Sequence, residues 1–562
     1  MVMKKTIIGL ILIIFCFFSI SPVLQDGFFP MHDDAQVARV VVMGKALLSG
    51  EFPVRIVRDL GYGYGYPIFN FYGPLPYYVG GMFSAIGVPG LTATKIMMIC
   101  GMVLGTLAAY ILGRRLFGVA GGMTSALFFT FFPYRAVQLY VRGAVGELWA
   151  TSCFLIILVG LLCLGDEKRR VRGIFIGALG LAGTILSHTV LGYAGVGILS
   201  VGLVCFLLYA MCVKRQIPQT FFSFCMVIVF GLAISAFFWL PAFFEMRYTN
   251  VSSVIGSTAD FHNHFVCLSQ LWDSPWGFGG SAPGCIDGMS FKLGKIHILI
   301  FTLSLLLWIF SFKKKSKEMQ ALMALVFIGC FASVFFTIGL SQYLWEHIPY
   351  FSFIQYPWRF LSFAGIFLSI TAGFVVYRMP NAWHSWIIFI FIALVGLFYI
   401  PLFQPQYTYW RNVSDFEQKE DIRYRASLVS DEYLPPDIPK PQNENEAMAG
   451  RISQNDTVSV KTLWENETGG EYEIDAKKTY DLRIRLAYFP GWTFSVNGKK
   501  VTPAIERGMP IIVLSEGASK VRMEFQNTFI RILANWISFA GCIMLLYVYG
   551  KETFGYYRRA RI

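Results

Sequence analysis

Carboxylate and guanidinium groups recur at three points of this chain, each at the end of an apolar stretch. The first is His32-Asp33-Asp34, the second is Arg142 with Glu147, and the third is Arg359. An acidic side chain can take the proton of a hydroxyl group, and the planar fork of arginine suits a phosphate ester. These residue types predict acid–base chemistry on a phosphorylated substrate, at the edge of a catalytic pocket.

The composition places these groups in a membrane protein. The chain has 562 residues, of which 55% are hydrophobic and only 14% charged, with a mean hydropathy of +0.55. A soluble protein of this length needs more charge to cover its surface. The formal charge of +13 falls in short Lys and Arg clusters between apolar runs. That pattern indicates positive charge retained in cytoplasmic turns, and it does not predict nucleic-acid binding.

The apolar runs predict a polytopic α-helical protein with about 12 transmembrane helices. Basic turns on one side predict an integral plasma-membrane protein with both termini in the cytoplasm. The first run is expected to be an uncleaved anchor, because Pro22 follows Ser19-Ile20-Ser21. The segments 25–90, 241–295 and 404–527 then lie outside.

Four domains are expected along the chain. Residues 1–403 form a multi-span membrane domain with a catalytic outer loop at 25–90, and the proline-rich stretch 404–455 is a linker. Alternation and turn signals predict an extracytoplasmic β-sandwich over 456–528, with a hairpin at Asn497-Gly498. Residues 529–562 add the last transmembrane helix and a cytoplasmic tail.

The first outer loop contains an aromatic run after the acidic pair. Tyr64, Tyr66 and Tyr72 alternate with glycines and prolines, and with His32 they are expected to form a platform for a sugar. The alternative is an aromatic belt at the membrane interface. An amphipathic pattern over 35–48 predicts an interfacial helix. Capping that helix is the alternative role for Asp33 or Asp34.

Three arginines are expected to bind a phosphate. Arg135 and Arg142 follow the third predicted span, at about 118–132, and Arg359 lies at the outer end of the tenth predicted span. Interfacial anchoring is the alternative role for these side chains. Cys267 and Cys285 share one outer loop and are disulfide candidates. His262 and His264, in the same loop, have no further metal ligand nearby, which favours a solvated loop.

The order of these motifs resembles the GT-C glycosyltransferases, membrane enzymes that use polyprenyl-linked sugars and include oligosaccharyltransferase. Three stretches look like a prokaryotic membrane family labelled as pyruvoyl-tetrahydropterin-synthase-related: Tyr66-Pro-Ile-Phe-Asn-Phe-Tyr72-Gly-Pro-Leu-Pro-Tyr77, Arg142-Gly143-x-x-Gly146-Glu147 and Gln355-Tyr-Pro-Trp-Arg359. The resemblance implies that Asp33 or Asp34 lies beside the sugar phosphate and acts as base for the acceptor.

The same resemblance implies a role for Glu147 as the carboxylate of the second outer loop. With Asp34 it would hold a divalent cation such as Mg²⁺ or Mn²⁺. Oligosaccharyltransferase has an Asp-x-Asp-like pair in this loop, where this chain has one glutamate. This chain also has no Trp-Trp-Asp motif in its outer domain. These departures weaken the case for a metal, and peptide N-glycosylation is not implied.

The expected function is transfer of a sugar from a polyprenyl-phosphate donor to a hydroxyl of a glycan, lipid or protein acceptor, on the outer face. Two alternatives are a lipid-linked sugar transporter or flippase, and a non-catalytic membrane protein that binds cell-envelope polysaccharide. A transporter usually needs polar groups near the bilayer midplane, and such groups are sparse in these spans.

Overall fold

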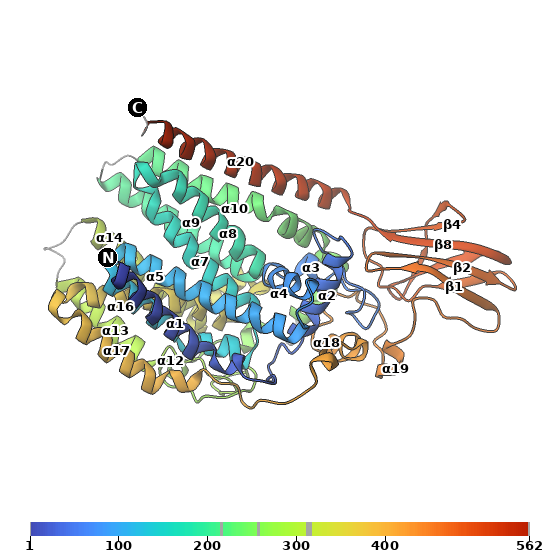
Figure 1. Ribbon diagram of the computed structural model, residues 1–562, viewed down its shortest axis with the longest axis horizontal. Coiled ribbons are helices and arrows are strands. Elements are labelled where there is room, and N and C mark those ends of the chain that lie inside the picture. The colour runs from blue at the N-terminus through green and yellow to red at the C-terminus, as the bar shows by residue number, and fades with distance from the viewer. Residues whose placement is uncertain (1, 214–216, 256–258, 311–316, 560–562) are drawn as a thin grey trace.

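The computed structural model describes residues 2–213, 217–255, 259–310 and 317–559. A long helical body carries a β domain at one end, and both chain termini lie toward the opposite end (Figure 1). The long helices of the body are α1 (Val2–Leu24), α5 (Gly90–Thr130), α7 (Val145–Leu164), α8 (Arg170–Ser187), α9 (Thr189–Val213), α10 (Ile217–Glu245), α13 (Lys295–Phe310), α14 (Lys317–Thr337), α16 (Leu361–Arg378), α17 (His384–Phe398) and α20 (Phe529–Arg559).

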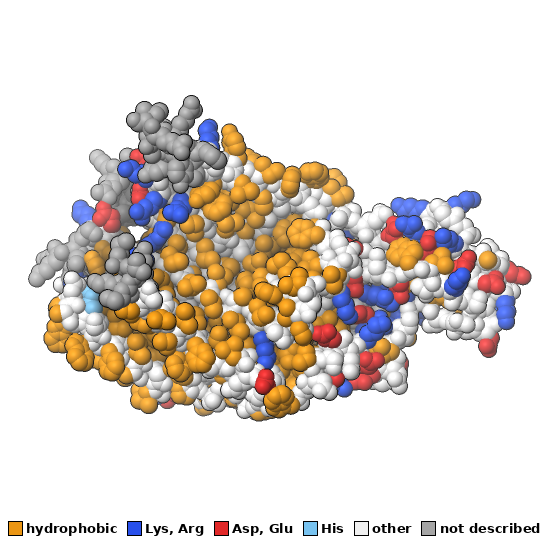
Figure 2. All heavy atoms as spheres, viewed as in Figure 1, with side chains coloured by type: hydrophobic (Ala, Val, Ile, Leu, Met, Phe, Trp, Pro, Cys, Tyr) orange, Lys and Arg blue, Asp and Glu red, His pale blue; other side chains and the backbone are white. Residues whose placement is uncertain are grey.

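Nine helices within the described ranges are long and apolar enough to cross a membrane. One of them, α5, is a hairpin. Gly118, with φ of 77°, breaks the helix, and the Thr106 and Thr130 hydroxyls, from its two arms, are hydrogen-bonded at 2.8 Å. With the second arm of α5 and the shorter apolar stretches of α9 and α13, these helices account for the predicted spans. Apolar side chains cover much of the visible face of this body (Figure 2), as lipid contact requires.

The first outer loop folds as a cap over the end of the helical body. It contains α2 (Gln36–Leu48), α3 (Ile68–Phe71) and α4 (Leu75–Ala85). The helix predicted at 35–48 is therefore present, but its N-cap is Ala35, and no side chain caps it. Neither Asp33 nor Asp34 therefore caps this helix, which was the alternative to their expected acid–base role.

The C-terminal β domain consists of two antiparallel sheets, as predicted. One sheet has the strand order β1-β2-β8-β4-β5 and the other β3-β7-β6. The strands are β1 (Val458–Glu465), β2 (Gly469–Ala476), β3 (Tyr480–Arg483), β4 (Trp492–Val496), β5 (Lys499–Val501), β6 (Ala504–Glu506), β7 (Met509–Leu514) and β8 (Gly517–Phe525). Val496 pairs with Lys499 across the predicted hairpin turn.

The stretch 404–455 packs against the first outer loop, although the sequence predicts a linker. It contains the short helices η11 (Val413–Glu417), η12 (Asp421–Arg425), α18 (Ala426–Val429) and α19 (Glu444–Ala447). The Glu417 carboxylate accepts the first N–H of α5 at 2.6 Å. Arg423 and Asp59 form a buried ion pair at 2.8 Å. Paired charges and buried side chains hold this stretch in place, where a free linker would be solvated.

Candidate active site

A cavity of about 990 Å³ lies where the ends of several helices meet the loop 25–90. Its wall combines residues that are far apart in the sequence, from the stretches 32–39, 71–73, 142–147, 188–193, 350–359 and 429–433 among others. This volume is at the upper end of the range of small-molecule sites. The cavity is therefore large enough for a sugar phosphate with a second ligand beside it.

Glu147 is the centre of the charged cluster on one wall. It lies in the first turn of α7 and is fully buried. Its carboxylate accepts from Arg142 at 2.7 Å, from Arg359 at 3.0 Å and from the Tyr134 hydroxyl at 3.0 Å. Buried charges persist only when they are paired. The two guanidinium groups and the one carboxylate leave the cluster with a formal charge of +1, which suits an anionic ligand.

Aromatic rings orient both arginines. The guanidinium of Arg142 lies 4.3 Å from the ring centroid of Trp358, and that of Arg359 lies 4.9 Å from that of Tyr356. Arg359 also donates to the Gln355 side chain at 3.1 Å. Burial disfavours the charged form of Arg142, but Glu147, Tyr134 and Asp33 together outweigh burial, so the pKa of Arg142 lies above its ordinary value. Arg142 therefore stays protonated although it is buried away from bulk water.

Backbone hydrogen bonds bring the acidic loop to this cluster. The chain reverses at Gly143, with φ of 64°, between η1 (Val137–Val141) and α7. A side chain there would collide with Met31. The Asp33 N–H donates to the Arg142 carbonyl at 2.9 Å, and the His32 N–H donates to that of Val141 at 3.1 Å. The two motifs that the sequence singled out are thus fixed side by side.

His188 is a member of the cluster that the predicted site does not include. It separates α8 from α9, and its Nε2 lies 3.9 Å from Glu147. Its Nδ1 accepts the Leu191 N–H at 3.2 Å, which leaves the Nε2 proton directed toward the carboxylate. Burial, with the charge of Arg359, lowers the pKa of His188 to about 3. The ring is therefore a neutral donor. Only its position at a break between two apolar runs could have indicated it.

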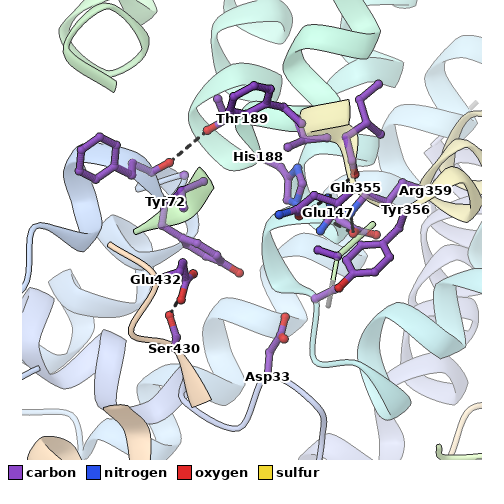
Figure 3. Close-up of a pocket in the computed structure, with 18 of the residues that line it drawn as sticks. Asp33, Tyr72, Glu147, His188, Thr189, Gln355, Tyr356, Arg359, Ser430 and Glu432 are labelled. Carbon is purple, nitrogen blue, oxygen red and sulfur yellow. Dashed lines mark hydrogen bonds and ion pairs between the residues drawn. The ribbon is translucent and has the colours of Figure 1, made fainter. Parts of the chain in front are cut away.

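The structure brings most of the predicted residues to one cavity. Asp33, Glu147, Arg142, Arg359, His32 and Tyr72 all line it. Figure 3 shows Asp33 and Tyr72 directed into the same space as Glu147 and Arg359.

Arg135 lies elsewhere, which corrects the prediction that it binds the phosphate with the other arginines. It is outside the cavity lining, buried against Met102 at 3.3 Å and 4.3 Å from the ring centroid of Phe129. The physical reason is its helical position. Tyr134 directs its hydroxyl to Glu147, and the next residue of α6 (Pro133–Ala136) points about 100° away.

Asp34, Tyr64 and Tyr66 also lie outside the cavity lining. Asp34 is exposed on the other side of the loop and interacts electrostatically with Asp421 and Arg411. The ring of Tyr64 is stacked under Arg485 of the β domain, with the guanidinium 4.2 Å from its centroid. Of the predicted aromatic platform, Tyr72 and His32 remain at the cavity.

The donor set does not fit the metal pair suggested for Asp34 and Glu147. Asp34 is absent from the cavity wall, and Glu147 is held by Arg142, Arg359 and Tyr134. A cation at Glu147 would have to displace two guanidinium groups. Over the described part of the chain, no three His, Cys, Asp or Glu side chains gather as a metal site.

The second outer segment covers another part of the cavity. A disulfide joins Cys267 and Cys285, with their Cα atoms 5.6 Å apart. Within this loop, the ring of His264 is hydrogen-bonded to Ser281 at 2.9 Å. His32 is hydrogen-bonded to the Phe278 carbonyl at 3.0 Å. The disulfide thus closes a loop that contacts the acidic motif.

The most informative residues outside the prediction come from the stretch 429–433. Ser430, Asp431 and Glu432 line the cavity, and Figure 3 shows Ser430 and Glu432 on the side opposite Glu147. The Ser430 hydroxyl donates to Glu432 at 3.3 Å. Burial raises the pKa of the Glu432 carboxyl above its ordinary value. Two adjacent carboxylates just before a proline-rich run were the available signal.

Comparisons with known proteins place the chain as follows. Residues 69–405 match the model of the family described as "6-pyruvoyl-tetrahydropterin synthase related domain; membrane protein". No curated protein matches the chain in sequence.

Several solved structures are similar in fold. The apo oligosaccharyltransferase of Archaeoglobus fulgidus is 14% identical, with a TM-score of 0.43, over 77% of this chain and 57% of that one. This chain thus spans little more than half the length of that enzyme. The oligosaccharyltransferase AglB of the same organism, in complex with an inhibitory peptide and a dolichol-phosphate, is 13% identical over 78% of this chain and 61% of that one, with a TM-score of 0.43. ArnT from Cupriavidus metallidurans, bound to undecaprenyl phosphate, is 14% identical over 76% of each chain, with a TM-score of 0.40.

Proposed function

The chain belongs to the membrane family described as 6-pyruvoyl-tetrahydropterin synthase related, and we propose that it is a glycosyltransferase. In this proposal it moves a sugar from a polyprenyl-phosphate donor to an acceptor hydroxyl on the extracytoplasmic face of the plasma membrane. Both chain termini are then cytoplasmic. The observation that supports the proposal best is a single cavity that joins Asp33 to the positively charged Glu147 cluster.

The donor phosphate is proposed to bind at Arg142 and Arg359. Both guanidinium groups line the cavity, and each is fixed by Glu147. A phosphate leaving group gains negative charge as its bond to the sugar breaks, and preorganised positive charge stabilises that state most. Glu147 is therefore a positioning residue, because its contacts hold both arginines in place.

Asp33 is proposed to accept the acceptor's proton. As the acceptor oxygen bonds to the anomeric carbon of the sugar, its proton passes to the Asp33 carboxylate. The bond between the anomeric carbon and the phosphate oxygen breaks, and polyprenyl phosphate leaves with the electron pair. The backbone hydrogen bond from Asp33 to Arg142 supports this role, because it holds Asp33 next to a residue proposed to bind the phosphate.

Neighbouring carboxylates provide the test. Asp33→Asn removes the proposed base, whereas Asp34→Asn changes an exposed carboxylate that does not line the cavity. The purified protein in detergent is given labelled undecaprenyl-phosphate glucose or mannose with sugar and peptide acceptors. Consumption of the donor without a membrane distinguishes transfer from transport.

The expected result is a rate about 10²- to 10⁴-fold lower for Asp33→Asn and near the wild-type rate for Asp34→Asn. Equal rates for the wild type and Asp33→Asn would remove this residue from the reaction. If the wild type consumes none of these donors, the proposed activity fails.

A further inference from the structure

The cavity has a second charged wall that the proposed transfer step does not use. In Figure 3, Glu432 and Tyr72 lie on one side, Glu147 and Arg359 on the other, and Asp33 between them. Glu432 belongs to the stretch that leads from the membrane helices to the β domain, and Tyr72 directly follows α3. The proposed base thus faces a phosphate side and a second side of different chemistry.

Arg39 is the cation of this second wall. It lies on α2, lines the cavity and is only 3% exposed. Its guanidinium is 4.3 Å from the ring centroid of Tyr72, and its one hydrogen bond among the described residues is a long one of 3.5 Å to the Tyr77 hydroxyl. Its Nε has no hydrogen-bond partner. A buried, unsatisfied donor is costly, which points to a ligand that accepts from Arg39.

Two carboxylates lie near Arg39 without forming ion pairs: Glu432 on this wall and Asp33 between the two walls (Figure 3). Among the described residues, no basic group lies within 4.0 Å of the Asp33 or Glu432 carboxylate. Both nevertheless interact electrostatically with Arg39. The opposite charges are close enough to attract and too far apart to pair. A group that donates hydrogen bonds to a carboxylate and accepts from a guanidinium can bridge that gap.

Sugar hydroxyl groups have this property, because each is both a donor and an acceptor. An anionic acceptor would be repelled by Asp33 and Glu432, and a serine or threonine side chain has only one hydroxyl. The Tyr72 ring and its hydroxyl lie beside the gap. An aromatic group there gives the apolar face of a sugar ring a surface to contact.

We propose that Arg39, Tyr72 and Glu432 form an acceptor subsite that binds a neutral sugar, with the reacting hydroxyl directed to Asp33. This inference rests on the proposed function, since it names the acceptor of the same reaction. It assigns a recognition role to the stretch 429–433. The acceptor is thus a glycan or a glycosylated molecule and not an unmodified peptide.

The test compares acceptors and variants with the full-length protein in detergent. The acceptor probes are methyl α-mannopyranoside and methyl β-glucopyranoside, against a serine-containing tripeptide, each with the labelled donors used above. The variants are Glu432→Gln, which keeps the shape of the side chain, and Arg39→Lys, which keeps the charge but loses the planar fork. The control is Asp437→Asn, an exposed carboxylate five residues after Glu432 that does not line the cavity.

The measured quantity is the ratio of sugar transferred to the glycoside to sugar lost to water. Loss of a hydrogen bond to a charged group should lower this ratio, and raise the KM for the glycoside, about tenfold to a hundredfold in each variant. Asp437→Asn should match the wild type. Hydrolysis of the donor by water needs no acceptor subsite. The amount of sugar lost to water therefore also shows that a variant is folded.

Two results would overturn the subsite. One is transfer by the wild type to the peptide and to neither glycoside. The other is a ratio for both variants within about twofold of the control. A wild type that neither transfers the donor sugar nor loses it to water refutes the proposed function itself, and the subsite with it. The two failures are therefore distinguishable.

Discussion

Replacing Glu147 with glutamine should destabilise the folded protein strongly. The carboxylate is fully buried and accepts from Arg142 at 2.7 Å, Arg359 at 3.0 Å and Tyr134 at 3.0 Å. Glutamine keeps one oxygen but directs an NH₂ group at one of these donors, and it leaves two buried guanidinium groups without a counter-charge. Breaking a buried ion pair in this way costs about 3–5 kcal/mol.

The free energy of unfolding can be measured by chemical denaturation in detergent, followed by tryptophan fluorescence. Glu444→Gln is the matched control, because Glu444 is half exposed and pairs with Arg425 at 3.2 Å on the surface. Such exposed pairs contribute about 0–1 kcal/mol. The double variant Glu147→Gln/Arg142→Gln removes both charges of one pair and should be less destabilised than the sum of the single variants, by about 1–3 kcal/mol.

Two outcomes would refute this reasoning. If Glu147→Gln costs no more than Glu444→Gln, then Glu147 does not compensate the arginines. If the losses of stability caused by Glu147→Gln and Arg142→Gln simply add in the double variant, the two side chains are not coupled in the folded protein. Either result would also remove the physical basis for a preorganised phosphate site.

Three further predictions concern the surroundings of the cavity. Burial raises the pKa of the Glu432 carboxyl in the folded protein above its ordinary value of 4.5. The free energy of unfolding should therefore fall as the pH rises from 4.5 through the raised pKa. Unfolding curves at several pH values should show that this free energy depends less on pH in Glu432→Gln than in the wild type. Replacing Cys267 and Cys285 with serine should cost about 2–4 kcal/mol, and resistance of this loop to proteolysis should fall; unchanged values would show that the disulfide does not constrain the loop. Glu245→Gln should cost about 3–5 kcal/mol, since it leaves the fully buried Arg531 without the carboxylate 3.0 Å away; a loss as small as that of the surface control used above would contradict this.

The helical body could be predicted almost completely from the sequence. A membrane span needs a long apolar run, because no water is present to satisfy the backbone, and such runs are visible in the chain. In the sequence, Arg114-Arg115 interrupts the apolar run that forms α5, and Gly118 breaks the helix close by. The β domain was equally visible, because alternation and the Asn497-Gly498 turn are local signals.

Site residues could be predicted by type and approximate place, but not one by one. Asp33 and Asp34 are equivalent in the sequence, and only the tertiary structure separates them: Asp33 lines the cavity and donates its N–H to the Arg142 carbonyl, whereas Asp34 is outside the lining. Arg135 and Arg142 are the same residue type and lie in the same segment between two apolar runs. The Arg135 side chain enters the helical body because the neighbouring Tyr134 is the residue of α6 that points to Glu147.

The sequence by itself determined which segments enter the membrane, which form the β domain, and which charged residue types lie near its surface. These properties depend on local composition and on periodicity. Only the tertiary structure decided that Arg39 and Glu432, nearly four hundred residues apart, line one cavity with Asp33. The physical reason is that side-chain direction at a helix end, and contact between distant segments, depend on packing across the whole molecule.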